Sequence, residues 1–275
     1  MDIDFKVLVN RKLFLCILVG ILVSFFSLLV SALAWKRVIE FFAETQISYR
    51  STTKVYLQAN LGKYIPGNIA HFVERNLFAE KAGMGHEETL MGTVLEIAGL
   101  LTAAFFLGII LSIENICRII GLFGSIEYAI ELLVLLTVGI AVVYLLYKKI
   151  SKIRYLCRKM RQKLFWRMFG LNVVLYIFSM ILLAGLMCVL VWVLEGQMLA
   201  GQDVWMVMDI YVLAWVVGFA VPGAPGGMGV REFVITYLTR NHRLQEYILL
   251  AMIVHRMITV MGDVFGYLWA QKCKV

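Results

Sequence analysis

The stretch VPGAPGGMGVREF, residues 221–233, interrupts an apolar segment that extends from Val204 to Arg240. A second interruption, KYIPGNIAHFVER, covers residues 63–75, and the three prolines of the chain all lie in these two stretches. Proline removes a backbone donor and glycine permits a left-handed turn. Each stretch is therefore predicted to end one half-helix and to begin another.

The composition around these breaks is that of an integral membrane protein. Of the 275 residues, 61% are apolar and 16% are charged, and the mean hydropathy is +0.85. An average soluble domain has about 45–50% apolar and about 25% charged residues. One soluble core of this size cannot bury such an excess, so lipid must cover much of it. The composition largely excludes secreted disulfide scaffolds, nucleic-acid binders and cytosolic enzymes.

Five apolar runs approach or exceed the length of about 20 residues that a helix needs to cross the hydrocarbon core. These runs are Leu13–Trp35, Met91–Ile113, Leu132–Tyr147 with its flank from Ile126, Met168–Leu194 and Tyr247–Ala270. The segments 48–77 and 204–240 contain the breaks and are predicted to be re-entrant hairpins, because broken backbone at membrane depth requires protein or water around it. The expected fold is all-α, a polytopic membrane protein with about five transmembrane helices and two re-entrant hairpins.

The two broken segments occupy matching positions in the two halves of the chain. In each half an arginine follows the proline of a Pro-Gly pair by nine residues, Arg75 after Pro66 and Arg231 after Pro222. We expect a single transmembrane domain with a first repeat at 13–113, a connector helix at 126–147, a basic loop at 148–167 and a second repeat at 168–270. A single connecting span inverts the second repeat, and inverted repeats with broken helices indicate a transport site near the bilayer midplane.

The net charge of +8 is concentrated in one place. Residues 148–167 contain nine lysines and arginines and no acidic residue. Such a segment is typical of a cytoplasmic loop beside anionic lipid headgroups. We expect a multi-pass protein of the cell membrane, the cytoplasmic membrane, with the first hairpin entering from the cytoplasm and the second from outside. The loop has no series of aromatic residues for base stacking, so no nucleic-acid partner is expected.

The half-helix after Pro66 and Gly67 carries His71 and Arg75 four residues apart, and therefore on one face. Its first N–H groups are free, and together with Arg75 they would attract a phosphate or a carboxylate. The alternative is that both side chains sit among headgroups, with Arg75 paired with Glu74 or another carboxylate.

The second break supplies a glycine-rich turn followed by Arg231 and Glu232. Consecutive backbone N–H groups in such a turn can form an anion-binding nest. It is not a nucleotide loop, because no Lys-Ser/Thr pair follows it. The alternative is a tight turn that lets two helices pack closely. The predicted substrate-binding residues at the two breaks are Pro66, Gly67, His71, Arg75, Pro225, Gly226, Gly227, Gly229, Arg231 and Glu232.

Four ionisable residues lie inside or beside apolar runs, where charge is costly and usually faces the bundle interior. They are Glu96, Asp209, Arg256 and Asp263. We expect Glu96 and Arg256 to form a buried polar seam, as a salt bridge or as a relay. No nucleophile triad can be assembled, and the five cysteines show no CxxC or Cys/His pairing. No catalytic residue, metal or cofactor is therefore expected.

The motifs KYIPGNIAHFVERNLFAEKAGM, TVLEIAGLL, VPGAPGGMGVREF and AMIVHRMITVMGD resemble the transmembrane region of the lysylphosphatidylglycerol synthase family, which includes flippase-like integral membrane proteins. The resemblance covers about residues 30–270. It implies functional positions at both breaks and at Glu96 and Arg256. It also implies translocation, between leaflets, of an anionic-headgroup lipid, a glycolipid or a polyprenyl-phosphate-linked sugar.

Two other functions remain open at this stage. One is a non-transporting membrane partner that presents lipid substrate to a separate aminoacyltransferase or glycosyltransferase. The other is a membrane-embedded enzyme acting on phospholipid headgroups. No segment resembles the soluble synthase domain of the family, so the chain is not expected to attach lysine to a lipid itself.

Overall fold

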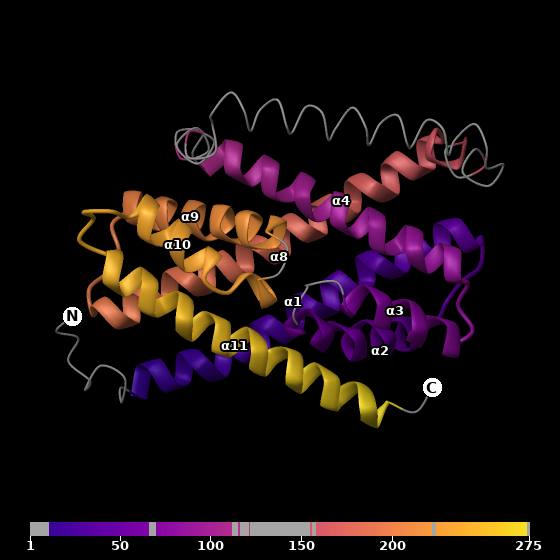
Figure 1. The fold of residues 1–275 in the computed structure, drawn as a ribbon, viewed down its shortest axis with the longest axis horizontal. Coiled ribbons are helices and arrows are strands. Elements are labelled where there is room, and N and C mark those ends of the chain that lie inside the picture. The colour runs from indigo at the N-terminus through magenta and orange to yellow at the C-terminus, as the bar shows by residue number, and fades with distance from the viewer. Residues whose placement is uncertain are drawn as a thin grey trace.

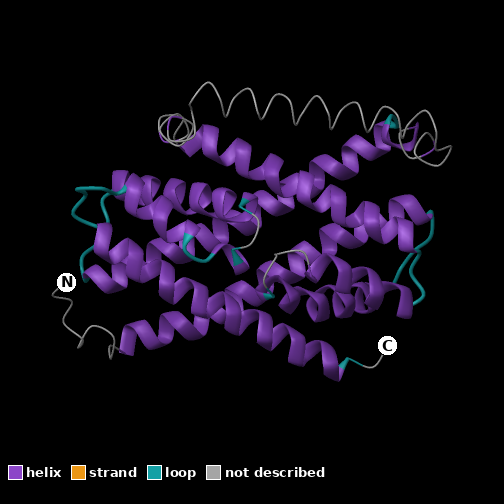
Figure 2. Ribbon diagram, in the orientation of Figure 1, coloured by secondary structure: helices purple, strands orange, loops and turns teal. Residues whose placement is uncertain are grey.

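The computed structural model describes residues 11–65, 70–111, 115, 121, 155, 158–221 and 224–273, and this part of the chain contains helices and no strand (Figure 2). Figure 1 shows the long helices crossing one another at the centre of the molecule. The helices with described bounds are α1 (Arg11–Ala43), α2 (Tyr49–Asn60), the 3-10 helix η2 (Leu61–Tyr64), α3 (Ala70–Lys81), α4 (His86–Leu111), α8 (Lys163–Glu195), α9 (Gly201–Ala220), the 3-10 helix η3 (Pro225–Gly227), α10 (Val230–Leu238) and α11 (Gln245–Lys272).

Five of these helices, α1, α4, α8, α9 and α11, are long and apolar enough to cross a membrane. Three of them, α1, α8 and α11, contain runs predicted from the sequence, and α4 contains the run from Met91 as far as Leu111, where its described part ends. Each of the four starts a few residues before its run. The predicted connector at 126–147 lies outside the described residues, as do residues 148–154, 156 and 157 of the basic loop predicted at 148–167. The last five residues of that predicted loop, 163–167, belong instead to helix α8. Helix α9 takes the fifth place, although the sequence predicts this region as one arm of a hairpin. The prediction of an all-helical, multi-pass membrane protein is confirmed.

Helix α1 forms the centre of the bundle and contacts α4, α8 and α11. Its inner face is tightly packed, with Trp35 and Ile39 completely buried. Its outer face carries large exposed apolar side chains, among them Phe14 and Leu22, and α4 exposes Phe105 in the same way. Such apolar surface suits contact with lipid chains rather than with water.

Two short pairs of helices, α2 with α3 and α9 with α10, lie toward opposite ends of the long axis (Figure 1). The 3-10 helices that follow α2 and α9 contact each other in the interior. At this contact, a Cβ atom on Gly226 of η3 would lie 3.5 Å from the ring of Tyr64 of η2. The two sequence breaks are therefore neighbours in space, although Tyr64 and Gly226 are 162 positions apart in the chain.

Lys159 ties the start of the second half of the chain to the end of α1. Its Nζ donates to the backbone carbonyls of Phe41 and Phe42, at 3.2 and 2.9 Å, and forms an ion pair with Glu44 at 2.7 Å. The last carbonyls of a helix lack intrahelical partners, so a lysine placed there satisfies them. The hydrogen bond and charge of Lys159 hold the pKa of Glu44 below its ordinary value.

We expect Lys159→Gln to lower the thermal midpoint of unfolding at neutral pH. Because the Glu44 pKa is depressed in the folded state, the ion pair stabilises the fold above the unfolded pKa, about 4.3, and this part is lost as the pH falls through the folded pKa. The carbonyl contacts do not titrate, so the gap between wild type and variant should shrink at acidic pH without closing. Midpoints measured from pH 7 to pH 3, with the exposed neighbour variant Arg158→Gln as control, test this; a gap independent of pH would contradict it.

Candidate functional site: a polar cavity between the two breaks

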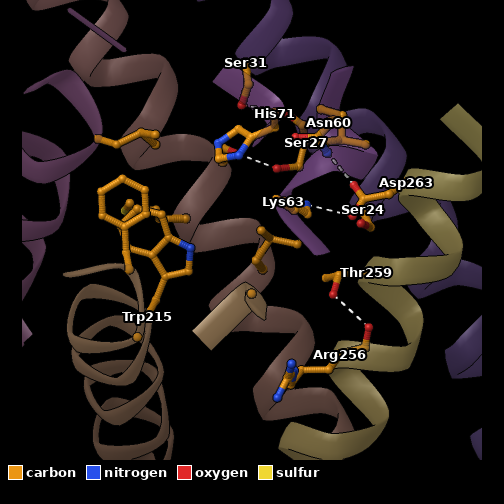
Figure 3. Close-up of a pocket in the computed structure, with 18 of the residues that line it drawn as sticks. Ser24, Ser27, Ser31, Asn60, Lys63, His71, Trp215, Arg256, Thr259 and Asp263 are labelled. Carbon is orange, nitrogen blue, oxygen red and sulfur yellow. Dashed lines mark hydrogen bonds and ion pairs between the residues drawn. The ribbon is translucent and has the colours of Figure 1, made fainter. Parts of the chain in front are cut away.

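A cavity of about 210 Å³ lies where the two breaks meet, and residues from α1, α2, α3, α4, α8, α9, α10 and α11 contribute to its wall. Figure 3 shows how Ser24, His71 and Arg256 surround this space. The polar and charged residues of the wall are Ser24, Ser27, Ser31, Tyr56, Asn60, Lys63, Tyr64, His71, Arg75, Glu96, Ser179, Tyr211, Arg231, His255, Arg256, Thr259 and Asp263.

The charge of Arg75 is neutralised by a carboxylate of the protein. Its guanidinium forms an ion pair with Glu96, and both residues are almost fully buried. Tyr56 donates its hydroxyl to Glu96 at 2.5 Å, and the ring of Tyr56 lies 4.1 Å from the Arg75 guanidinium carbon. The alternative in which Arg75 pairs with a carboxylate is therefore the observed one, with Glu96 in place of Glu74.

Glu96 and Arg256 do not form the salt bridge that is one of the two forms predicted for the buried seam. Arg256 donates to Glu232 at 2.7 Å, across the contact between α10 and α11. The reason is tertiary: α3 packs on α4 and places Arg75 next to Glu96, while Glu232 in the first turn of α10 reaches α11. A buried charge pairs with the nearest opposite charge that packing places beside it. For Arg75 and for Arg256, that partner comes from the same half of the chain.

Asp263 forms a third polar cluster, which joins α11 to α2 and η2. It accepts hydrogen bonds from Asn60 at 2.7 Å and from Tyr64, and it pairs with Lys63 at 2.7 Å. Figure 3 shows the contacts of Asn60 and Lys63 with Asp263 as dashed lines. The sequence identified Asp263 as a charge inside a span, but its partners depend on how α2 packs against α11.

The glycine-rich turn is less open to an anion than the sequence predicts. The N–H of Gly229 donates to the side chain of Glu232 at 2.8 Å, and the N–H of Gly227 donates to the carbonyl of Ala224 at 2.9 Å. Two N–H groups of the predicted nest are thus already bonded, and Glu232 serves as a helix cap and an ion-pair partner. Pro66, Gly67 and the side chain of Pro225 lie outside the described part of the chain.

Arg231 differs from the other cations of the cavity. Among the described residues it is the lysine or arginine of the wall that forms no ion pair. Its Nε is buried without a hydrogen-bond partner, as is the Nε of Arg75. The side chain runs beside two glycines: a Cβ on Gly218 would lie 2.7 Å from its Cγ, and a Cβ on Gly227 would lie 2.8 Å from its Nε. Because both positions lack a side chain, the guanidinium can reach the cavity wall.

No protein-family model, curated protein or solved structure matches this chain significantly. The resemblance to the lysylphosphatidylglycerol synthase transmembrane region therefore stays a prediction from the sequence motifs.

We expect Gly218→Ala to displace Arg231, because the added methyl group would overlap the middle of its side chain rather than a free end. The lipid exchange that the sequence motifs predict should fall in reconstituted vesicles, while the thermal midpoint should drop by only a few degrees. Gly185→Ala is the matched control, since a Cβ on that α8 glycine meets no atom within 4 Å. Equal exchange rates in the two variants would show that the path of Arg231 past Gly218 does not matter.

One polar face of the cavity was not predicted from the sequence. Ser24, Ser27 and Ser31 lie on one side of α1 and line the wall, and the hydroxyls of Ser27 and Ser179 hydrogen-bond each other. His255, which precedes Arg256 in the sequence, also lines the wall. The spacing of three and four residues between the serines within the first apolar run was a usable signal, because it places the hydroxyls on one face of a helix.

Proposed function

We propose that this chain is a flippase-like protein that moves an anionic-headgroup lipid or glycolipid between the leaflets of the cytoplasmic membrane. The observation that carries the proposal is Arg231, a guanidinium without an ion-pair partner among the described residues, at the wall of an internal polar cavity. An unpaired charge inside a membrane protein is costly and is a default candidate for function. A lipid phosphate would supply the missing negative charge through a bidentate contact.

The arrangement of the broken segments supports a translocation path. We infer that α2 with α3 and α9 with α10 are the re-entrant hairpins of two inverted repeats, because their breaks meet at the cavity. In such proteins one repeat moves against the other around a fixed midplane site. The headgroup would occupy the cavity, and the acyl chains would stay in the hydrocarbon core.

The inferred topology has its own test. Single cysteines at Asn68 and Met228, in a background without the native five cysteines, are expected to react with small permeant reagents. A reagent that cannot cross the membrane should reach position 68 from the cytoplasm and position 228 from outside. Labelling of both positions from the same side would contradict the inverted repeat.

The function itself is tested in vesicles of phosphatidylcholine that contain a trace of chain-labelled fluorescent phosphatidylglycerol. Dithionite added outside bleaches only the outer leaflet unless the label crosses, so the protein should extend bleaching to the inner pool. Protein-free vesicles set the background, and a vesicle-entrapped soluble dye controls for leakage. Bleaching equal to the background would contradict translocation and would favour the alternative, a non-transporting partner that presents lipid to a separate aminoacyltransferase or glycosyltransferase.

A further inference from the structure

Among the described residues of the cavity wall, every lysine or arginine except one pairs with a carboxylate. Lys63 pairs with Asp263, Arg75 with Glu96 and Arg256 with Glu232. These pairs account for three of the four lysines and arginines of the wall. Arg231 is the fourth, so within the described residues the wall carries one uncompensated positive charge.

The neighbour of Arg231 in the sequence does not neutralise it. One carboxylate oxygen of Glu232 accepts from Arg256 at 2.7 Å and the other accepts from the N–H of Gly229 at 2.8 Å. Both oxygens are therefore engaged, and the buried Nε of Arg231 stays without a partner. Holding a charge away from water without a partner of opposite charge is costly. A ligand with one negative charge would remove this cost.

Further polar atoms of the wall also lack a partner. His71 is 7% exposed and His255 is 0% exposed, and in both the Nδ1 atom is buried without a hydrogen bond. Buried polar atoms are hydrogen-bonded in nearly all proteins, so two such atoms in one cavity indicate a missing donor or acceptor. The hydroxyls of Ser24, Ser27 and Ser31 line the same space. A neutral group that both donates and accepts, such as the hydroxyl of a polyol or a sugar, suits this set.

The cavity has the size of a headgroup rather than of a whole lipid. Its volume of about 210 Å³ is below the roughly 300–1,000 Å³ of pockets that enclose a drug-sized ligand. A phosphodiester with a small polyol therefore fits better than one that includes acyl chains.

We propose that the cavity selects a phosphodiester with a single negative charge and a hydroxylated headgroup, with the phosphate on Arg231 and the hydroxyls on the serines and histidines. This inference rests on the proposed function and narrows it. A phosphomonoester or a diphosphate brings additional negative charge, for which the wall offers no further unpaired cation among the described residues. Polyprenyl diphosphate sugars are thereby disfavoured, whereas phosphodiester-linked lipids with polyol or sugar headgroups are favoured.

The test measures the thermal midpoint of the purified full chain in neutral detergent at pH 8, where histidine with its ordinary pKa of about 6.5 is neutral. Lipids with identical acyl chains are titrated into the micelles. Phosphatidylglycerol has one charge and hydroxyls, phosphatidylmethanol has one charge and no hydroxyl, phosphatidic acid is a phosphomonoester, and phosphatidylcholine is zwitterionic. Phosphatidylglycerol is expected to raise the midpoint most, phosphatidylmethanol less, and the other two least.

Any other order of the lipids, ranked by their effect on the thermal midpoint, would overturn a specific part of the proposal. A midpoint raised as much by phosphatidic acid as by phosphatidylglycerol would overturn the selection for a single charge. Equal effects of phosphatidylmethanol and phosphatidylglycerol would overturn the role of the hydroxyls. Soluble glycerophosphoglycerol separates the two sources of the same chemistry: stabilisation by it alone, without an effect of the lipid, would show that a free phosphodiester is the ligand and would overturn the assignment to a lipid headgroup.

Arg231→Gln should weaken the apparent affinity for phosphatidylglycerol about tenfold or more, the loss expected for one charge-assisted contact. The exposed Arg240→Gln, outside the cavity, should keep the wild-type affinity. An unchanged affinity in Arg231→Gln would overturn the assignment. Selective stabilisation without bleaching of the inner leaflet would reject translocation and leave the headgroup selectivity intact, so the two proposals fail separately.

Discussion

Arg231→Gln is expected to slow lipid exchange in reconstituted vesicles by about ten- to one-hundredfold, because a hydrogen bond to a charged group contributes roughly 1.5–3 kcal/mol. The variant should fold as well as the wild type or better. Arg231 forms no ion pair among the described residues, so the substitution leaves no buried carboxylate behind and removes an uncompensated charge. Loss of exchange with an unchanged or higher thermal midpoint is the expected combination.

Arg231→Lys keeps the charge without the planar fork of donors, so its exchange rate should lie between those of wild type and Arg231→Gln. The matched control is Arg240→Gln, which removes an exposed arginine that does not line the cavity. It should exchange lipid at the wild-type rate. Arg231 would have no part in transport if Arg231→Gln and Arg240→Gln exchanged lipid equally fast.

Arg75→Gln and Glu96→Gln are each expected to destabilise the protein by about 3–5 kcal/mol, the cost of leaving one partner of a buried ion pair alone. Arg75 also lies over the rings of Tyr56 and Trp35, at 4.1 and 5.4 Å, so its loss removes cation–π contacts as well. The double variant should lose less stability than the sum of the two single losses, because it leaves no unpaired charge. The free energy of unfolding of these three variants is measured by unfolding them in mixed micelles with a denaturing detergent.

A parallel cycle identifies the partner. Glu96→Gln combined with Arg256→Gln should show additive losses, because Glu96 and Arg256 share no partner in the structure. Coupling between Glu96 and Arg256, with additivity between Glu96 and Arg75, would show that the observed pairing is not the one in the membrane. Lipid exchange measured in the same variants separates a structural role of Arg75 from binding, since structural loss should reduce the amount of folded protein and not the rate per folded molecule.

The positions of the long helices and of the two breaks follow from the sequence, since both depend on local properties. An apolar run of sufficient length must be helical in lipid, because its backbone groups have no other partner. Pro66 and the glycines after Pro222 interrupt such helical runs whatever the tertiary fold. The distinction between a span and one arm of a hairpin is less local, and α9 shows why: its 20 residues satisfy the length and composition of a span, although a break follows directly.

The helical fold, the place in a membrane and the presence of charges that lipid cannot cover thus follow from local sequence. Which charge pairs with which depends on the packing of the helices. Arg75 and Arg231 are equivalent in sequence, each nine residues after the proline of a Pro-Gly pair. Yet α3 carries Arg75 to Glu96, whereas Glu232 is engaged by Arg256 and Gly229, and Arg231 has no ion pair within the described part of the chain. The hydropathy of a run and the breaking of a helix are determined by residues close together in the sequence. An ion pair depends on the packing of helices that are far apart in the chain.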